Sequence, residues 1–504
     1  MRNAHDVASI RAAEAQLMAT LPPGTLMERA ATGLVSVVID AAGGAYGLRV
    51  VLLVGSGDNG GDALLAGWHL ATRGARVDAV LMSPTRHDHV ETLLLVGGRI
   101  HEADSLGELT QHSWWVSAEV VIDGIVGIGG AGGLREQAAR IVSQIPEEAM
   151  IISVDIPSGV DADTGEVTGS AVDSDVTVCM GSFKPGLMVD PGANMAGKIE
   201  LIDIGLQRYL PEPVIEALQV DDVVQKLPYP ERDSDKYQRG VVGIVAGSAQ
   251  YPGAAVLSVA GAIRAGAGYV RLIAPSSVIS LVQEDFPEVV ATELPEVEFP
   301  DFAQQMIGLA GRVQSWVVGP GLGTSELSAS LVDVVLDSEV PVLLDADALT
   351  ILARSENLRQ KVRQRPFATV LTPHAGELAR LLDVERDLIE ARPYHFVKQA
   401  AVAFNCCVLL KGSITLVAEP TGAVRANPTG TAWLGTAGSG DVLSGLAGTY
   451  LSAGCSALDA GSVAAFVHGV AGQVLSHGEV SPLRSRELAD ALPQAVAALR
   501  ESSV

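Results

Sequence analysis

Residues 49–62 read RVVLLVGSGDNGGD. The apolar run at 49–55 predicts a strand that is covered on both faces, as in a parallel sheet. A glycine-rich turn follows, and the next residues predict a helix from about Gly61 to Arg73 that ends at Gly74. A second strand, RVDAVLM at 76–82, completes a βαβ unit.

The same alternation of strand and helix extends along the rest of the chain, with one interruption. Further strands are predicted at 120–126, 150–156, 176–181, 199–204, 240–246, 269–274, 315–319, 341–345, 369–372 and 407–411. Between about Leu206 and Arg239 the pattern fails, and proline and charged residues dominate. We therefore expect an α/β protein with two doubly wound domains, at 1–210 and 235–504, joined by a polar linker at 211–234.

Composition limits the classes of partner. The 504 residues are 48% hydrophobic and 18% charged, which is typical of a globular protein. The net charge of -25 argues against nucleic acid and against an anionic membrane surface. A phosphate-bearing small molecule would need local helix N-termini, lysines or cations to offset this field.

Cysteine usage and apolar stretches indicate the compartment and whether the chain spans a membrane. The four cysteines include no C-x-x-C pair, and we expect reduced, buried thiols. The start of the chain reads as a charged helix, and the uncharged stretch from Ala460 to Gly478 is short and contains His468, so we expect a buried helix there. These features predict a cytoplasmic protein without a membrane span.

Polar side chains follow several strands of the first half. Residues 55–60 match G-x-G-x-x-G, which indicates a dinucleotide-binding turn or simply a tight turn. Asp123, Asp155 and Ser158 end two further strands. Because parallel strands end at one edge, Asn59, Asp123 and Ser158 could form an oxygen-rich cation site, with Asp155 free for acid–base work. Caps of helices and turns are the alternative.

The motifs GSGDNGGD, DGIVGIGG, VDIPSG and FKPGL, in this order, make the first half resemble the NAD(P)H-hydrate epimerase family. The resemblance implies a Rossmann-like three-layer sandwich and a potassium ion held by Asn59, Asp123 and Ser158. It implies substrate contacts at Asp58, Asn59, Gly60, Gly61, Asp62, Gly127, Ile128, Gly129, Gly130, Ala131, Gly132, Gly133 and Asp155.

The chemistry of that family requires only a proton shuttle. Hydrated NADH or NADPH carries a hydroxyl beside the ring nitrogen, and protonation of this hydroxyl lets the nitrogen lone pair expel water. Water then returns to either face. We expect Asp155 to be the catalytic carboxyl group, with Lys184 assisting it or binding phosphate.

The strongest motif of the second half is TAGSGDVLSG, residues 436–445. Small residues before an apolar helix predict backbone N–H groups that converge on an anion, with Asp441 beside them. Such an aspartate can accept a hydroxyl proton while the anion hole stabilises a migrating phosphoryl group. An ordinary helix cap is the alternative.

With YPGA, GPGLG, LLDADAL, LTPHAGE and LLKGSITLV, this motif makes residues 240–490 resemble the ribokinase-like ADP/ATP-dependent NAD(P)H-hydrate dehydratase family. The resemblance implies phosphorylation of the hydroxyl by ADP or ATP with Mg²⁺, followed by elimination of phosphate. Asp441 would be catalytic. The implied substrate contacts are Ala254, Gly321, His374 and Asp441, and the implied nucleotide contacts are Lys411, Gly412, Ser413, Ile414, Thr415 and Gly440.

Two other interpretations stay open from the sequence. The second half could be a ribokinase-like small-alcohol or vitamin kinase with an appended non-catalytic nucleotide-binding domain. The first half alone could be a binding or scaffold module. The main hypothesis is repair of hydrated NAD(P)H, with this metabolite and an adenine nucleotide as small-molecule partners and a homo-oligomeric assembly.

Overall fold

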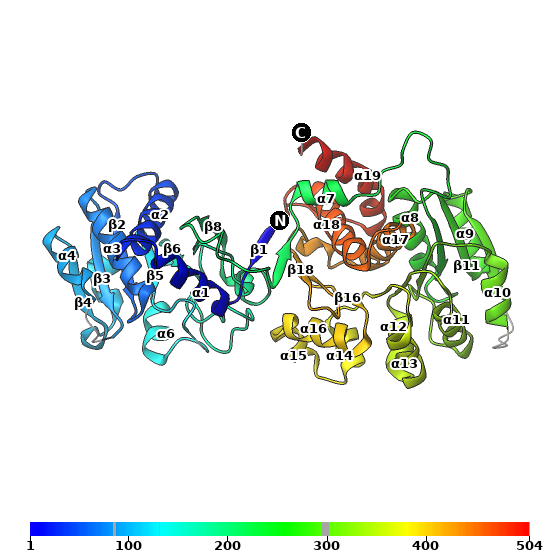
Figure 1. The fold of residues 1–504 in the computed structure, drawn as a ribbon, viewed down its shortest axis with the longest axis horizontal. Helices are drawn as coiled ribbons and strands as arrows, with labels where there is room; N and C mark the ends of the chain where they lie inside the picture. The colour runs from blue at the N-terminus through cyan, green and yellow to red at the C-terminus, as the bar shows by residue number, and fades with distance from the viewer. Residues whose placement is uncertain (84–86, 131, 295–301, 503–504) are drawn as a thin grey trace. The chain divides into compact units, whose positions relative to one another are not determined.

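The computed structural model describes residues 1–83, 87–130, 132–294 and 302–502 (Figure 1). Contacts divide the chain into two compact units. The N-terminal unit is Asn3–Ile215, and the C-terminal unit is Glu216–Val504 together with Met1–Arg2. Each unit is built around its own sheet.

The N-terminal unit contains a seven-stranded sheet in the order β4-β3-β2-β5-β6-β7-β8, in which every pair is parallel. Its strands are β2 (Arg49–Val54), β3 (Arg76–Leu81), β4 (Arg99–Glu102), β5 (Val120–Gly124), β6 (Met150–Val154), β7 (Val176–Met180) and β8 (Lys198–Ile202). Its helices are α1 (Val7–Met18), α2 (Thr25–Ala42), α3 (Asp58–Thr72), α4 (His89–Leu95), α5 (Ser113–Val116) and α6 (Glu136–Val142). The strand order reverses between β2 and β5, and ligands of such sheets bind in the crevice at this reversal.

Alternate residues of β2 belong to two separate cores. Val50, Leu52 and Val54 pack with α1 to α4, whereas Val51 and Leu53 pack with α5 and α6. Side chains of a strand alternate between the two faces of a sheet, so the sheet is covered on both sides. The predicted three-layer sandwich is confirmed.

The C-terminal unit contains the second sheet, with the order β1-β9-β18-β17-β16-β15-β14-β13-β10-β11-β12. Its strands are β1 (Arg2–Ala4), β9 (Ile215–Ala217), β10 (Val241–Val245), β11 (Tyr269–Pro275), β12 (Val290–Leu294), β13 (Ser315–Val318), β14 (Val342–Leu344), β15 (Thr369–Leu371), β16 (Cys407–Leu410), β17 (Thr415–Ala418) and β18 (Val424–Asn427). The pairs from β12 to β16 are parallel, and β17 runs antiparallel to both of its neighbours. Here the order reverses between β10 and β13.

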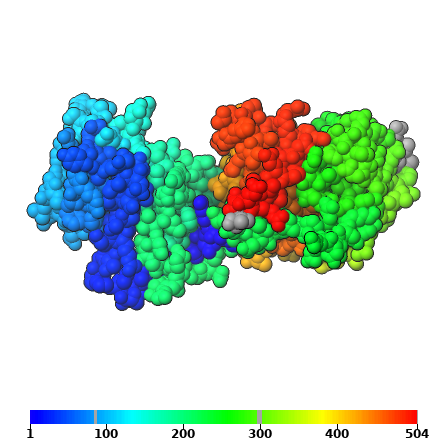
Figure 2. Space-filling model, turned by 90° about the horizontal axis from the view of Figure 1, so that it is seen from above, coloured from blue at the N-terminus to red at the C-terminus, as the bar shows by residue number. Residues whose placement is uncertain are grey.

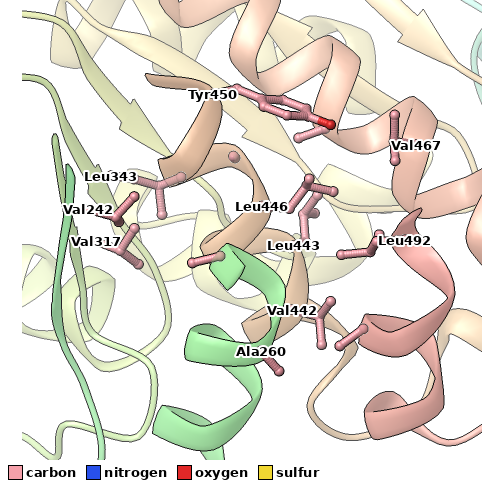
Figure 3. Close-up of a cluster of buried hydrophobic side chains, with 14 of the residues drawn as sticks. Val242, Ala260, Val317, Leu343, Val442, Leu443, Leu446, Tyr450, Val467 and Leu492 are labelled. Atoms are coloured by element: carbon pink, nitrogen blue, oxygen red, sulfur yellow. The ribbon is translucent and has the colours of Figure 1, made fainter. Parts of the chain in front are cut away.

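The helices of this unit cover the sheet. They are α7 (Val220–Lys226), α8 (Pro252–Arg264), α9 (Ser276–Asp285), α10 (Phe302–Ala310), α11 (Glu326–Leu336), α12 (Asp347–Arg354), α13 (Glu356–Gln364), α14 (Ala375–Leu382), α15 (Arg386–Ala391), α16 (Pro393–Phe404), α17 (Ser439–Ser452), α18 (Ala457–Ser476) and α19 (Ser485–Ser502). Figure 3 shows Val442, Leu443 and Leu446 of α17 among side chains of the sheet, α8, α18 and α19. The space-filling view shows α19, in red, at the surface of this unit beside green segments from its beginning (Figure 2).

The twelve strands predicted from the apolar runs are all present, within one or two residues of the expected bounds. Helix α3 begins at Asp58 and not near Gly61, because Gly57 is the extended residue before it. The stretch around Ala460 lies in α18. Among the described residues this helix alone is long and apolar enough to cross a membrane, and 67% of its apolar window is buried inside the protein.

The predicted linker, residues 211–234, contains regular structure. Strand β9 pairs with β18 through Glu216 and Arg425, and α7 packs against α18 and α19. Leu218, Val223 and Leu227 are buried in the core of the C-terminal unit. Val220 and Val224 also pack against this core, and the polar and charged residues between these apolar side chains hide the role of α7 in the sequence.

A fragment that begins at Glu216 should therefore be more stable than one that begins at Asp235. The shorter fragment loses three buried aliphatic side chains, each contributing about 1.5–3 kcal/mol. It also leaves Arg425 without Glu216, its partner at 3.2 Å. Urea unfolding of the two fragments measures the difference, and equal midpoints and slopes would show that α7 is dispensable.

Candidate active sites

A cavity of about 1000 Å³ lies at the strand reversal of the N-terminal unit. Its walls include Gly55–Asn59 after β2, residues 125–130 after β5, Asp155 after β6 and one side of α1. The loop after β2 can approach β5 only because residue 55 is glycine: a Cβ there would lie 1.7 Å from the carbonyl oxygen of Ile125.

Asp155 faces this cavity and is held by a buried lysine. Its Oδ1 accepts hydrogen bonds from Lys184 Nζ and, at 2.9 Å, from the Met180 backbone N–H. Burial lowers the pKa of Lys184, but the charges of and hydrogen bonds to Asp155 and Cys179 together outweigh burial, and the pKa lies above its ordinary value. Lys184 is therefore an ammonium that positions Asp155, and it is not among the cavity-lining residues. This geometry favours the assisting role over phosphate binding.

Three further carboxyl groups line the cavity: Asp58, Asp62 and Glu14. Burial, followed by Asp155, Asp58 and Glu14, raises the pKa of Asp62 well above its usual range. Burial and the Asp155 carboxylate also raise the pKa of Glu14. Burial in a cavity crowded with acids therefore favours the protonated form of these two groups.

Two arginines line the cavity as well, and the motifs do not reveal them. Arg11 lies in α1, and Arg135 directly precedes α6. Arg11 approaches the loop after β5, because a Cβ at Gly129 would lie 2.9 Å from its guanidinium. Arg11, Glu14 and Met18 occupy one face of α1 at helical spacing, which was the one available signal for this wall.

Of the three predicted cation ligands, Asp123 and Ser158 are hydrogen-bonded to one another, and Asn59 faces the loop after β5. Asp123 is 1% exposed, and its Oδ1 accepts the Ser158 hydroxyl at 2.6 Å. Burial raises the pKa of Asp123, and its hydrogen bonds with Ser158 oppose that shift. A Cβ at Gly127 would lie 2.1 Å from Asn59 Oδ1, so that amide oxygen points to the loop after β5. Oxygen ligands around one buried carboxyl fit a monovalent cation such as potassium.

The other predicted substrate residues fall into two groups. The cavity is lined by Gly127, Ile128, Gly129, Gly130, Gly132 and Gly133, whereas Gly60 and Gly61 are buried and do not line it. A Cβ at Gly60 would lie 2.2 Å from the Gly55 carbonyl oxygen, so this glycine permits a tight turn. Ala131 lies outside the described residues.

In the C-terminal unit, the predicted anion loop does precede a helix. Gly438 adopts φ 91°, which favours glycine, and α17 begins at Ser439. Within the described residues, the backbone N–H groups of Gly440 and Asp441 have no acceptor, as expected at a helix N-terminus. Burial, followed by the Asp345 carboxylate, raises the pKa of Asp441 to about 7.

Lys411 links this loop to the ends of three neighbouring strands. Its Nζ contacts Asp345 Oδ1 at 2.8 Å and Glu377 Oε2 at 3.9 Å. A Cβ at Gly440 would lie 3.4 Å from the same Nζ. Asp345, which we did not single out from the sequence, also accepts the Ser444 hydroxyl at 2.6 Å. Asp345 thus joins the lysine to α17, and its position at the end of β14 was the missed signal.

The remaining predicted contacts lie on the same edge of the sheet. Gly321 is adjacent to Ala254, since a Cβ on Gly321 would lie 2.7 Å from Ala254 Cβ. His374 caps α14 and accepts the Gly376 N–H at 3.0 Å through Nδ1. Directly after Lys411, the turn between β16 and β17 contains Gly412, Ser413 and Ile414, and β17 begins at Thr415.

His468 forms a hydrogen bond with Ser439, the first residue of α17, and the sequence did not predict this contact. Burial lowers the pKa of this imidazole to about 4, so it is neutral. Its Nε2 lies 3.0 Å from the Ser439 carbonyl oxygen and must donate to it.

Comparisons with known proteins show which families the two halves resemble. A family model described as NAD(P)H-hydrate dehydratase matches residues 242–494, and one described as YjeF-related protein N-terminus matches residues 23–186. Proteins named bifunctional NAD(P)H-hydrate repair enzyme Nnr are 44% identical in Mycobacterium leprae, over 93% of each chain, and 44% identical in Mycobacterium tuberculosis, over 90% of each chain.

A solved structure resembles the C-terminal unit. It is the ADP/ATP-dependent NAD(P)H-hydrate dehydratase from Bacillus subtilis, co-crystallised with ATP and Mg²⁺, at 29% identity and a TM-score of 0.50. The alignment covers 56% of this chain and 98% of that one. The chain belongs to the family of bifunctional NAD(P)H-hydrate repair enzymes.

Proposed function

We propose that the N-terminal cavity interconverts the R and S epimers of hydrated NADH and NADPH, and that the C-terminal site dehydrates the S epimer with ADP or ATP. One observation supports this assignment above all. Acidic groups lie where the strand order of each sheet reverses, and each group of acids suits one of the two reactions of the repair. A homo-oligomer and a cytoplasmic location remain predictions from the sequence.

Epimerisation needs a proton donor and a shielded cavity. When the hydroxyl beside the ring nitrogen is protonated, the C–O bond breaks, water departs and the nitrogen lone pair forms an iminium. Water then adds to the other face and returns a proton. The cavity carboxyls can supply and recover this proton, while Arg11 and Arg135 offer positive charge to the pyrophosphate of the substrate.

Dehydration needs a better leaving group than hydroxide. Asp441 removes the hydroxyl proton as the oxygen attacks the terminal phosphorus of the nucleotide, and the N–H groups at the start of α17 stabilise the phosphoryl oxygens. Lys411 neutralises charge on the nucleotide phosphates. In this transfer the bond from the terminal phosphorus to the rest of the nucleotide breaks. The ring nitrogen then expels phosphate, which leaves far more readily than hydroxide, and the resulting iminium loses a proton from the adjacent ring carbon to give NAD(P)H.

Two cations accompany these sites in our proposal. Asn59, Asp123 and Ser158 would hold potassium, which offsets negative charge beside the loop after β2. Mg²⁺ would arrive with the nucleotide. The described residues contain no cluster of three or more His, Cys, Asp or Glu side chains that could hold a metal ion. Mg²⁺ is usually held by one or two carboxylates together with phosphate oxygens, and Asp345 and Glu377 lie nearby.

Asp441→Asn should lower the dehydratase kcat by about 10²–10⁴-fold, because the amide cannot accept the proton. In the wild type, kcat/KM should rise with pH through about 7, since the base works only when deprotonated. The variant should lose this limb and retain epimerisation. Asp387→Asn, an exposed change in α15, is the matched control. Near-normal dehydration by the Asp441 variant would make that residue a helix cap.

Potassium dependence tests the cation site. Replacing potassium by a bulky organic cation should slow the epimerisation of the R epimer, because the ligand oxygens cannot close around the larger ion. Asp123→Asn removes the only carboxylate of the three ligands and should make the rate insensitive to the exchange. Equal wild-type rates in the two salts would reject a functional potassium site.

A further inference from the structure

Asp62 and Asp155 are the buried carboxyl groups among the described residues that line the N-terminal cavity, and Asp62 has no partner. It is 9% exposed, it lies one turn into α3, and it lines the cavity. No hydrogen bond or ion pair within the described part of the chain reaches its carboxyl oxygens. Asp155, by contrast, already accepts hydrogen bonds from Lys184 and Met180.

The charged groups around Asp62 come from several elements. They are Asp58 in the same helix, Glu14 and Arg11 in α1, Asp155 with Lys184 behind it, and His87 after β3. His87 is tied to the Gly55 carbonyl oxygen at 2.7 Å. The nearest charges that act on Asp62 are carboxylates, and together with burial they raise its pKa well above the usual range. A buried carboxyl without a donor or a counter-ion keeps its proton.

We propose that Asp62 is the proton donor of the epimerase reaction, a role distinct from substrate contact. The inference rests on the proposed epimerase function of this cavity. Asp62 gives its proton to the hydroxyl oxygen, the C–O bond breaks with both electrons on oxygen, and water leaves. The nitrogen lone pair forms the iminium. Water then adds to the opposite face, and the Asp62 carboxylate takes back the proton.

Asp155 has a complementary part in this proposal. Its carboxylate is fixed by the Lys184 ammonium and lies in the same cavity as the cationic iminium. The two carboxyl groups thus have different surroundings, one hydrogen-bonded and one without a donor, which is the usual sign of separate roles in acid–base catalysis.

The test compares wild type, Asp62→Asn and Asp155→Asn with pure R epimer of hydrated NADH, measuring its conversion to S and the uptake of ¹⁸O from labelled water. Asp62→Asn should lower kcat by about 10²–10⁴-fold, with KM changed by less than about threefold. Wild-type kcat/KM should fall as pH rises, because the donor must be protonated. This limb should persist in Asp155→Asn and vanish in Asp62→Asn.

Asp40→Asn, an exposed change in α2, is the control for the substitution itself, and Tm is measured for each protein. Near-normal turnover by Asp62→Asn, or loss of the high-pH limb in Asp155→Asn instead, would overturn the proposal. Should Asp62→Asn fail to fold, a wild-type kcat/KM that does not fall at high pH would overturn it equally, because the donor must be protonated. A wild type that never interconverts the epimers refutes the proposed function, and this inference with it.

Discussion

The burial of neighbouring carboxyl groups is the constraint on which both sites depend. Parallel strands bring their carboxyl ends to one edge, so acids that follow different strands are forced together away from water. In the first half this raises the pKa of Asp62, and in the second it raises the pKa of Asp441 to about 7. One carboxyl thereby keeps a proton to give, and the other binds a proton strongly enough to take one from a hydroxyl.

Close backbone approaches make this crowding possible. Gly55 lets the loop after β2 touch the end of β5, and Gly445 lets α17 press against α8, where a Cβ would lie 1.9 Å from the Ser258 carbonyl oxygen. Lysines then limit the cost of the remaining charge: Lys184 holds Asp155, and Lys411 holds Asp345. Each site thus combines a carboxylate paired with a lysine and at least one carboxyl that has no hydrogen-bonded counter-ion.

Much of the fold could be predicted from the sequence because buried parallel strands are uninterrupted apolar runs. The loops could be predicted because glycines and acids follow those runs at regular places. The arginine and glutamate of α1 could not, since an isolated helical face of Arg11, Glu14 and Met18 looks like an ordinary surface. The same holds for α7, whose few inward residues are diluted by charged ones, and for Lys184, whose burial only tertiary structure determines.

The carboxyl groups of Asp62 and Asp441 bind protons more tightly than ordinary aspartates. Infrared spectra of wild type, recorded against Asp62→Asn and Asp441→Asn at about pH 6, test it most directly, since free aspartate is ionised there. Each difference spectrum should contain the C=O stretch of a protonated carboxyl. Differences confined to ionised carboxylate bands would contradict it.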